Sequence, residues 1–553
     1  MKRNHLFHTC AALALSLVML LGLTIPAAAA EKAEPVSRVF AKVDAGTLIG
    51  YKEGKVYNFR GIPYAQAERF QNPVPITSYE KTYGSDTYAA LTYGEVSPQS
   101  RTLSATGDVN PYEFFTPSNG TADMVGNENC QFLNVWTNNM TGKKPVLVFF
   151  HGGGLTTGAS SELSCYTGEE FAANYDGVFV SVNTRLNILG FLDLSAYGKE
   201  YEGSGMVGME DGIEALKWVQ KNIAKFGGDP KNVTILGQSG GGEKVSTLAC
   251  MSDSAGLFDK VVYMSGMYST ASKEDGLANT QKLVDHLKLE KGKVVETLTN
   301  MPYEQLLEAA DAAGWRAATH YGDGTFTAPL FDENGKMNPN AAKRTWIFGT
   351  AYSEFNGNMP NLAYGTENAD DFSKLTDADA EKRIREQYGS DAAEFISEFK
   401  KAYPGRPLME SLYMSGLGGA SSISRYALIR PDNGVLKRCD ENGVTAYNYV
   451  SAYSQPIFGG VTMTHTGDIP YWFHTVDTAP YFIRGDEANA AKAETAMSAA
   501  LFSFMQNGDP STRSLSWKPY TVDEPVTMVF SANSRAMTGH DAQLYAIMAK
   551  NAD

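Results

Sequence analysis

The sequence lacks several features that mark other classes of protein. Its 47 Lys and Arg residues are outnumbered by 62 Asp and Glu, so it lacks the basic excess that neutralises nucleic-acid phosphates. Beyond residue 25 it has no apolar run approaching the ~20 residues of a membrane-spanning helix. It also has no Pro/Ser-rich linker, internal repeat or low-complexity block after about Pro35. We therefore expect neither a nucleic-acid partner nor a string of small modules.

Cysteine is also scarce, with five residues in the 553-residue chain. Cys130, Cys165, Cys250 and Cys439 are widely separated, whereas a structural zinc site needs closely spaced pairs of ligands. The sequence therefore predicts no metal and no cofactor. Export would permit disulfides, but a chain of this length does not need them, so pairing among these four cysteines stays open.

The amino terminus has the organisation of a signal peptide. The basic start Met1–Arg3 is followed by the apolar stretch Cys10–Ile25 and by the small residues Ala28–Ala30. A membrane anchor is the alternative, but about 16 apolar residues fall short of the ~20 that a span needs. We predict a signal peptide over residues 1–30, a secreted or extracytoplasmic protein without a membrane span, and one mature domain over residues 31–553.

Short apolar runs alternate with a helical pattern along the middle of the chain. Residues 145–150, 178–182 and 233–236 predict buried strands, and residues 211–226 carry apolar side chains at helical spacing. The order strand, helix, strand implies a parallel sheet. Further strands are predicted at 260–264 and 346–348, and charged helical insertions at about 270–343 and 370–402. We predict an α/β fold with a mostly parallel central sheet flanked by helices, and large helical insertions over one end.

The strand at 233–236 leads directly into the sequence Gly-Gln-Ser-Gly-Gly at residues 237–241. This is the pattern of a nucleophile elbow, a turn so tight that only small residues fit two positions either side of the serine. A helix over about 242–249 can follow and direct its N-terminal amides at developing negative charge. Glycine is frequent here, so the motif alone is weak, and its place after a strand is what favours Ser239 as a nucleophile.

A second glycine motif, His-Gly-Gly-Gly at residues 151–154, directly follows the predicted strand ending at Phe150. Consecutive glycines leave backbone N–H groups uncovered, so they could stabilise an oxyanion together with the amide of Gly240. A phosphate-binding loop is the competing interpretation. It fails because no Gly-Lys-Ser/Thr follows and no dinucleotide-binding spacing is present.

A base and an acid must follow Ser239 in the order Ser, acid, His that the α/β-hydrolase class uses. His465 lies in a loop-like stretch, and His474, nine residues on, is the competitor that we expect to pack against aromatic side chains. Glu354 follows the predicted strand at 346–348 after a short connection. The pattern favours His465 and Glu354 without excluding other pairs.

The chain resembles the type-B carboxylesterases, the family of the cholinesterases and the bacterial para-nitrobenzyl esterases. The matching segments run nearly from end to end and match least between about 270 and 440. They are residues 59–65, 127–136, 151–154, 183–192, 215–219, 222–239, 502–510 and 517–520.

Carried over position by position, the resemblance implies Ser239 as nucleophile, His465 as base and Glu354 as acid. The family's glycine five residues before its Glu is Gly349 here. The resemblance also implies that Gly153, Gly154 and Gly240 donate to the oxyanion.

Three positions depart from the family pattern. The nucleophile is flanked by Gln238 and Gly240 where the family usually has Glu and Ala, which removes a buried charge and keeps the amide donor. Ser97 stands where the partner of Cys130 in a family disulfide is expected, so that bridge is predicted to be absent. Met206 replaces a usual Asn, with no consequence that the sequence predicts.

The sequence thus predicts a secreted serine carboxylic-ester hydrolase that acts on a small-molecule ester through an acyl-enzyme. One alternative is a non-catalytic binding protein on the same fold, because a fold does not prove a function. The other is an acyl hydrolase with amide, thioester or lipid substrates, since these share the same machinery. The oligomeric state cannot be predicted from the sequence.

Overall fold

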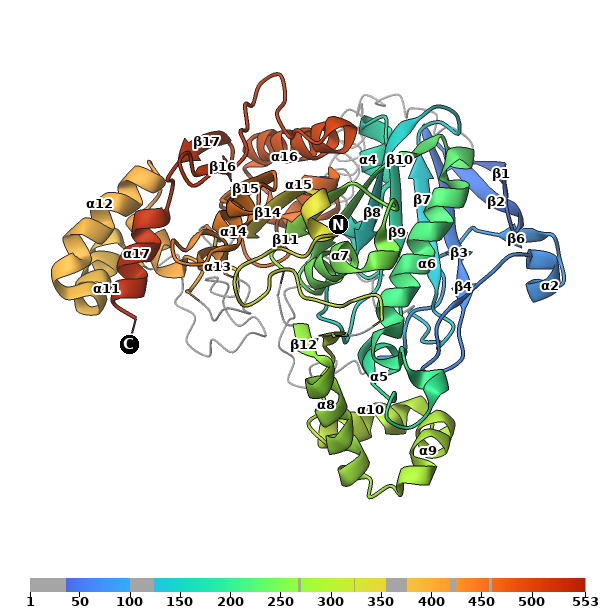
Figure 1. Cartoon of the computed structure of the whole chain (residues 1–553). Coiled ribbons are helices and arrows are strands. Elements are labelled where there is room, and N and C mark those ends of the chain that lie inside the picture. Colours follow the sequence, from blue (N-terminus) through green and yellow to red (C-terminus); the bar gives the residue numbers. More distant parts are fainter. Residues whose placement is uncertain are drawn as a thin grey trace, which may run out of the picture.

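The computed structural model describes residues 36–99, 124–266, 270–322, 324–354, 375–417, 424–456 and 460–552. The predicted signal peptide lies outside these ranges. A 13-stranded sheet runs through the molecule (Figure 1). Its strands are β1 (Ser37–Val43), β2 (Gly46–Glu53), β3 (Val56–Pro63), β6 (Thr87–Ala89), β7 (Phe132–Thr137), β8 (Lys144–Phe150), β9 (Val178–Val182), β10 (Gly228–Gln238), β11 (Lys260–Met264), β14 (Thr345–Ala351), β15 (Ala446–Ser451), β16 (Val526–Phe530) and β17 (Arg535–Thr538).

The centre of the sheet is parallel, as the sequence predicts. From β9 through β8, β10, β11, β14 and β15 to β16, every neighbouring pair is parallel, whereas β1 to β3, β7 and the edge strand β17 pair antiparallel along the sheet. Strands β8, β9 and β11 are buried at every residue, because helices cover both faces. Two small sheets pair β4 (Ala65–Gln66) with β5 (Val74–Pro75) and β12 (Thr270–Ser272) with β13 (Thr319–Tyr321).

Helices α6 and α7 lie on one side of the sheet in Figure 1, and α16 lies on the other. The helices of the described ranges are α2 (Tyr79–Tyr83), α4 (Glu169–Asn174), α5 (Asn187–Phe191), α6 (Val207–Asn222), α7 (Gly240–Cys250), α8 (Lys273–His286), α9 (Val294–Asn300), α10 (Tyr303–Ala312), α11 (Asp377–Tyr388), α12 (Ala392–Ala402), α13 (Arg425–Ile429), α14 (Val435–Glu441), α15 (Ile469–Phe473), α16 (Glu487–Asn507) and α17 (Ala542–Lys550).

The two predicted insertions do contain helices. Helices α8 to α10 form one group that contacts α5 through α10, and α11 and α12 form another that packs on α17 (Figure 1). Polar residues start these helices: Ser272 and Asp275 form a capping box at α8, and Thr376 and Asp379 form one at α11.

Element boundaries differ from the sequence prediction where glycine and the serine turn intervene. The helix predicted to reach Phe226 ends as α6 at Asn222 and continues as a 3₁₀ turn, which Gly227 closes at φ 78°. The helix predicted from residue 242 begins at Gly240, because Ser239 itself is its N-cap. The turn between β10 and α7 is therefore a single residue.

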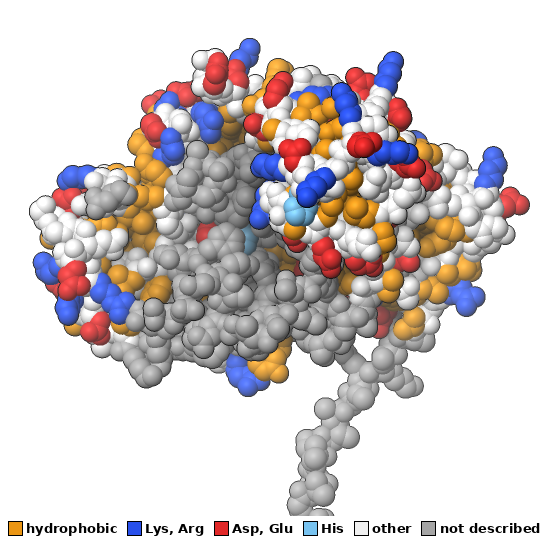
Figure 2. Space-filling view, turned by 90° about the horizontal axis from the view of Figure 1, so that it is seen from below, with side chains coloured by type: hydrophobic (Ala, Val, Ile, Leu, Met, Phe, Trp, Pro, Cys, Tyr) orange, Lys and Arg blue, Asp and Glu red, His pale blue; other side chains and the backbone are white. Residues whose placement is uncertain are grey.

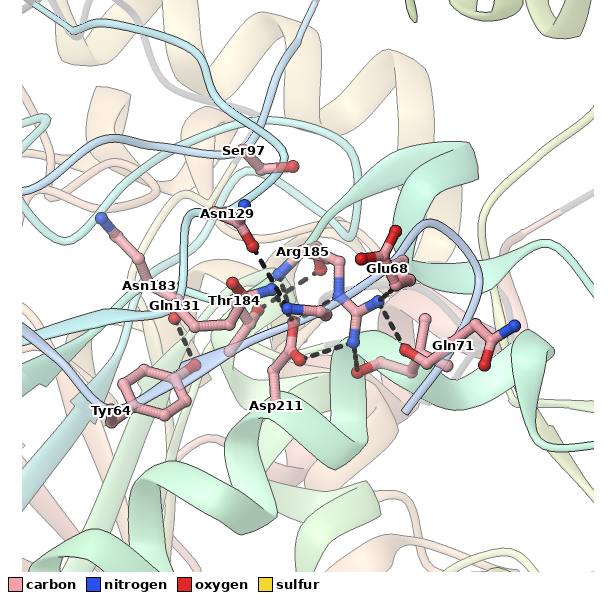
Figure 3. Close-up of polar contacts among 12 residues, drawn as sticks. Tyr64, Glu68, Gln71, Ser97, Asn129, Gln131, Asn183, Thr184, Arg185 and Asp211 are labelled. Atoms are coloured by element: carbon pink, nitrogen blue, oxygen red, sulfur yellow. Dashed lines mark hydrogen bonds and ion pairs between the residues drawn. The ribbon is translucent and has the colours of Figure 1, made fainter. Parts of the chain in front are cut away.

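A buried ion pair fixes the segment after β9 to α6 (Figure 3). The Arg185 side chain donates to both carboxylate oxygens of Asp211, at 2.9 and 2.7 Å, and to the backbone oxygen of Gln71 at 2.7 Å. The backbone N–H of Arg185 also donates to Asp211, at 2.9 Å. Both side chains are almost inaccessible, so each charge depends on the other for its stabilisation.

Replacing Asp211 with alanine is expected to lower the free energy of unfolding by about 3–5 kcal/mol, because Arg185 would remain buried without a counter-charge. Equilibrium urea unfolding followed by tryptophan fluorescence measures it. Asp432→Ala is the matched control, since its pair with Arg430 is 63% exposed on the acid and should contribute about 0–1 kcal/mol. Equal losses in the two variants would contradict the structural role of the buried pair.

The acidic excess is not gathered into one patch on the face shown in Figure 2. Acidic, basic and apolar side chains are interspersed over the described part of that face. Among the helices of the described ranges, none is both long and apolar enough to cross a membrane.

Candidate active site

Ser239 occupies a strained turn at the carboxyl end of β10. Its φ of 59° and ψ of −125° are rare for a residue with a side chain, and such strain costs about 1–3 kcal/mol. The flanking glycines allow the turn. A Cβ at Gly237 would lie 1.9 Å from the backbone oxygen of Gly241, and a Cβ at Gly241 would lie 2.0 Å from that of Phe150. The local sequence therefore permits this conformation only because both positions lack side chains.

The glycine loop after β8 lies against the same turn. Gly153 and Gly154 have φ of 88° and 64°, in the left-handed region that glycine tolerates. A Cβ at Gly152 would be 3.2 Å from Cβ of Ser239, and a Cβ at Gly240 would be 2.0 Å from the backbone oxygen of Gly154. The structure thus brings the three glycines of the predicted oxyanion hole together beside the serine.

His465 and Glu354 meet although 111 residues separate them. The imidazole Nδ1 lies 2.6 Å from Oε2 of Glu354, and the backbone N–H of His465 donates to the backbone oxygen of Glu354 at 3.0 Å. Both side chains are buried, with 3% and 2% of their surfaces exposed. A carboxylate can only accept, so Nδ1 is the donor and Nε2 carries the lone pair of the neutral ring.

The Glu354 carboxylate is itself held in place. Its other oxygen, Oε1, accepts from Oγ of Ser265 at 2.7 Å and from the backbone N–H of Ala351 at 2.8 Å. Sequence reasoning missed Ser265, although it follows β11 by one residue, at the carboxyl end of a parallel strand where functional side chains gather.

The far side of the imidazole faces the residue before the serine. Nε2 of His465 lies 3.2 Å from Nε2 of Gln238, which is buried at the end of β10. Ser239 is the next residue, so the structure aligns Glu354, His465 and the serine turn across one end of the sheet.

Asp468 is a second buried acid beside this group, and the sequence gave no signal for it. Its Oδ2 accepts from Oγ of Ser451 at 3.0 Å and from the hydroxyl of Tyr449 at 3.3 Å. Burial, reinforced by the nearby charge of Glu354, raises the pKa of Asp468 to about 6. This acid therefore takes up a proton at mildly acid pH.

Lys244 is a buried cation on the first turns of α7. Its Nζ donates to the backbone oxygen of His151 at 3.3 Å, which links the nucleophile helix to the start of the glycine loop. Burial lowers the pKa of Lys244 to about 7, although the charges of Glu243 and Glu162 act in the opposite direction. The adjacent charges Glu243 and Lys244 inside an apolar helix were the sequence signal that could have marked this residue.

His474, the competing histidine, lies apart from the acid. Its ring packs edge-on against Tyr175 with centroids 5.8 Å apart, and its Nδ1 lies 3.2 Å from Oγ of Ser498. The predicted packing of His474 against aromatic side chains is confirmed.

The four cysteines are free and buried, so no disulfide joins them. Ser97 hydrogen-bonds the Cys130 thiol, and burial raises the pKa of that thiol. The expected absence of the Cys130 bridge is thus confirmed. Within the described ranges, no cluster of three or more His, Cys, Asp and Glu side chains could hold a metal ion. Met206, the third departure from the family pattern, receives the backbone N–H of His320 on its sulfur at 3.1 Å.

A pocket of about 330 Å³ adjoins the glycine loop. Thr156 and Thr157, the second and third residues after Gly154, form one wall, and both hydrogen-bond back to the oxygen of Gly153. The rest of the lining comes from α5 and from α10 and the residues after it, namely Asn187, Ile188, Leu307, Ala310, Asp311, Trp315, Arg316 and Ala317.

The parallel sheet, the strained serine turn and the flanking helices define the α/β-hydrolase fold, as predicted. The sequence profile of the carboxylesterase family matches residues 37–547. The chain therefore belongs to the carboxylesterase family, which confirms the resemblance seen in its motifs, and it is a carboxylic-ester hydrolase.

Characterised relatives cover nearly the whole chain. The para-nitrobenzyl esterase of Bacillus subtilis (strain 168) is 27% identical over 509 residues, which are 88% of this chain and 94% of that protein. The phenmedipham hydrolase of Pseudarthrobacter oxydans is 27% identical over 513 residues, 89% of this chain and 95% of that protein.

Solved structures agree in fold. An esterase from anaerobic Clostridium hathewayi that can hydrolyse aliphatic aromatic polyesters superposes with a TM-score of 0.80 and 29% identity, covering 94% of this chain and 100% of that one. A carboxylesterase from Geobacillus stearothermophilus superposes with a TM-score of 0.68 and 26% identity, covering 92% and 100%.

Proposed function

We propose that the protein is a secreted serine esterase that forms an acyl-enzyme on Ser239, with His465 as base and Glu354 as the orienting acid. The observation that carries this proposal is the alignment of Glu354, His465 and the strained turn of Ser239. Nδ1 of His465 is committed to the carboxylate at 2.6 Å, so Nε2 is the nitrogen available to a substrate-side proton.

In the first half-reaction, Nε2 of His465 takes the hydroxyl proton as Oγ of Ser239 attacks the ester carbonyl carbon. Glu354 holds the ring in the required tautomer and stabilises the imidazolium. The tetrahedral intermediate then collapses, the C–O bond to the alcohol breaks, and the leaving oxygen takes the proton from Nε2. Water repeats the sequence on the acyl-enzyme and releases the carboxylic acid and free Ser239.

The carbonyl oxygen becomes negative in both tetrahedral intermediates. We assign its stabilisation to the backbone N–H groups of Gly153, Gly154 and Gly240, which the close approach of the loop and α7 brings together. The positive end of α7 points at the same place. Lys244 fixes the loop relative to α7 from behind.

The substrate is a small-molecule ester, as for the family. We assign part of the ester to the pocket beside Thr156, because its apolar walls begin two residues from a predicted oxyanion donor. Leu307, Trp315 and Ile188 would bury an apolar or aromatic group, and polar Asp311 and Arg316 stand among the lining residues.

Secretion rests on the basic, apolar and small-residue order of residues 1–30. N-terminal sequencing of protein recovered from the culture medium tests it. A mature protein starting near Glu31 is expected, and a chain that keeps its apolar stretch in the membrane fraction would overturn secretion.

The acyl-enzyme can be trapped directly. We expect rapid acid quenching after mixing with excess 4-nitrophenyl butyrate to leave a butyryl group on the peptide that contains Ser239, detectable by mass spectrometry. A stopped-flow burst of 4-nitrophenol of about one equivalent per active site should accompany it. Turnover without label or burst, even with deacylation slowed at low pH, would argue for direct attack by water.

A further inference from the structure

The carboxamide of Gln238 occupies the face of His465 that must accept a proton. Its Nε2 lies 3.2 Å from Nε2 of the imidazole and 3.4 Å from Oγ1 of Thr466. The side chain is 1% exposed, so water does not compete for these contacts. The two hydrogens of the amide nitrogen thus have two acceptors, one on the base and one on the residue after it.

Thr466 fixes which end of the amide faces the base. It has a φ of 73°, a conformation that is strained for a β-branched residue and persists only where its surroundings enforce it. This conformation directs Oγ1 at the amide nitrogen. The amide oxygen faces the glycine loop instead, where a Cβ at Gly152 would lie 3.0 Å from it.

An N–H directed at Nε2 favours one protonation state of the base. In the neutral ring Nδ1 holds the proton shared with Glu354, and Nε2 offers a lone pair that the amide can bond. Once Nε2 is protonated, two donors face one another, and the amide must turn to present its oxygen. A carboxylate of the same shape would do the reverse, because it accepts from the imidazolium and attracts its charge.

We propose that Gln238 is a positioning residue that holds His465 in its neutral, proton-accepting form, so that the side chain at 238 sets the pH below which the base stops working. This rests on the proposed role of His465. It identifies a feature of this chain, where an uncharged donor stands at a position that Glu usually fills in the family.

Other charged groups also face the base. Glu354 lies on Nδ1, and Asp468, held by Ser451 and Tyr449 from β15, lies close enough to interact with both His465 and Glu354. These groups are unchanged in a variant at 238. The difference between variants therefore reports the amide alone, whereas the absolute midpoint includes Asp468.

The test compares pH profiles of kcat/KM for 4-nitrophenyl butyrate in the mature chain and in Gln238→Glu, which is nearly isosteric. A carboxylate about 3 Å from the imidazole should move the acid limb upward by about one pH unit. The ratio of kcat/KM at about pH 5.5 to that at about pH 8.5 should then fall about tenfold. Gln238→Met, which removes the donor without adding charge, should give a smaller upward shift.

Thr466→Val supplies an independent variant, because it removes the acceptor that fixes the amide and keeps the β-branched shape. Its acid limb should also move upward, by less than that of Gln238→Glu. Thermal unfolding of each variant separates these effects from misfolding, since a merely structural role would lower the rate equally at all pH values. An acid limb that stays in place or moves to lower pH in Gln238→Glu would overturn the proposal.

A second readout does not depend on turnover. The Nδ1 proton of His465 gives a far-downfield proton NMR signal, which is assigned by its loss in His465→Gln and can be titrated in each variant. A midpoint raised by Gln238→Glu supports the proposal even if the ester is not hydrolysed. Hydrolysis failing while this midpoint shifts would count against the proposed function alone.

Discussion

Alanine in place of Ser239 is expected to lower kcat for 4-nitrophenyl butyrate by about 10⁶-fold, to near the rate in buffer. The variant keeps the glycine loop and the base but has no oxygen that can carry the acyl group, and loss of a triad nucleophile costs about this much in other serine hydrolases. Steady-state hydrolysis of the purified mature chain and the variant measures it, with far-ultraviolet circular dichroism to verify folding.

Ser246→Ala is the matched control for this experiment. Ser246 lies on the same helix, α7, is also buried, and donates only to the backbone oxygen of Glu243 at 3.0 Å in the described structure. Its loss should change kcat by less than about threefold, because surface-neutral and local hydroxyl deletions rarely exceed about 1 kcal/mol. A Ser239→Ala variant as active as Ser246→Ala would remove Ser239 from the mechanism and favour the binding-protein alternative.

Glutamine in place of His465 is expected to lower kcat by a similar factor, about 10⁵- to 10⁶-fold. An amide can fill the space but cannot take a proton from Ser239 or return it to the leaving alcohol. Because nucleophile and base act as a unit, the double variant with Ser239→Ala should be little worse than either single variant.

His474→Gln is the control for the base. It lies nine residues from His465 and contacts Tyr175 and Ser498 instead of Glu354. Its kcat/KM should stay within about threefold of the parent, since only packing and a partly exposed hydrogen bond are lost. A large loss in His474→Gln together with normal activity in His465→Gln would reverse the assignment of the base.

The motifs that sequence reasoning located best are those whose parts are adjacent in the chain. The serine turn and the glycine loop are each carried by a few consecutive residues, and their glycines are required by backbone approach distances near 2 Å. Such local constraints leave a direct trace in the sequence. The same holds for the buried strands β8, β9 and β11, whose short apolar runs predicted their position.

The acid and base were harder, because 111 residues separate Glu354 from His465 and acidic residues are common. The required chain order reduced the candidates, and the resemblance to a family selected between them. No periodicity predicts that a loop after β15 will meet a loop after β14, since that depends on which strands become neighbours in the sheet.

The sequence by itself determined the fold class, the position of the serine turn and the glycine loop, since each depends on contiguous residues and on backbone geometry that only glycine allows. The tertiary structure alone decided how the pieces face one another: Ser265 on Glu354, Lys244 on the glycine loop, and Gln238 on His465. These contacts join elements far apart in sequence, and the sheet order that brings them together is set by packing of the whole chain, which no local pattern encodes.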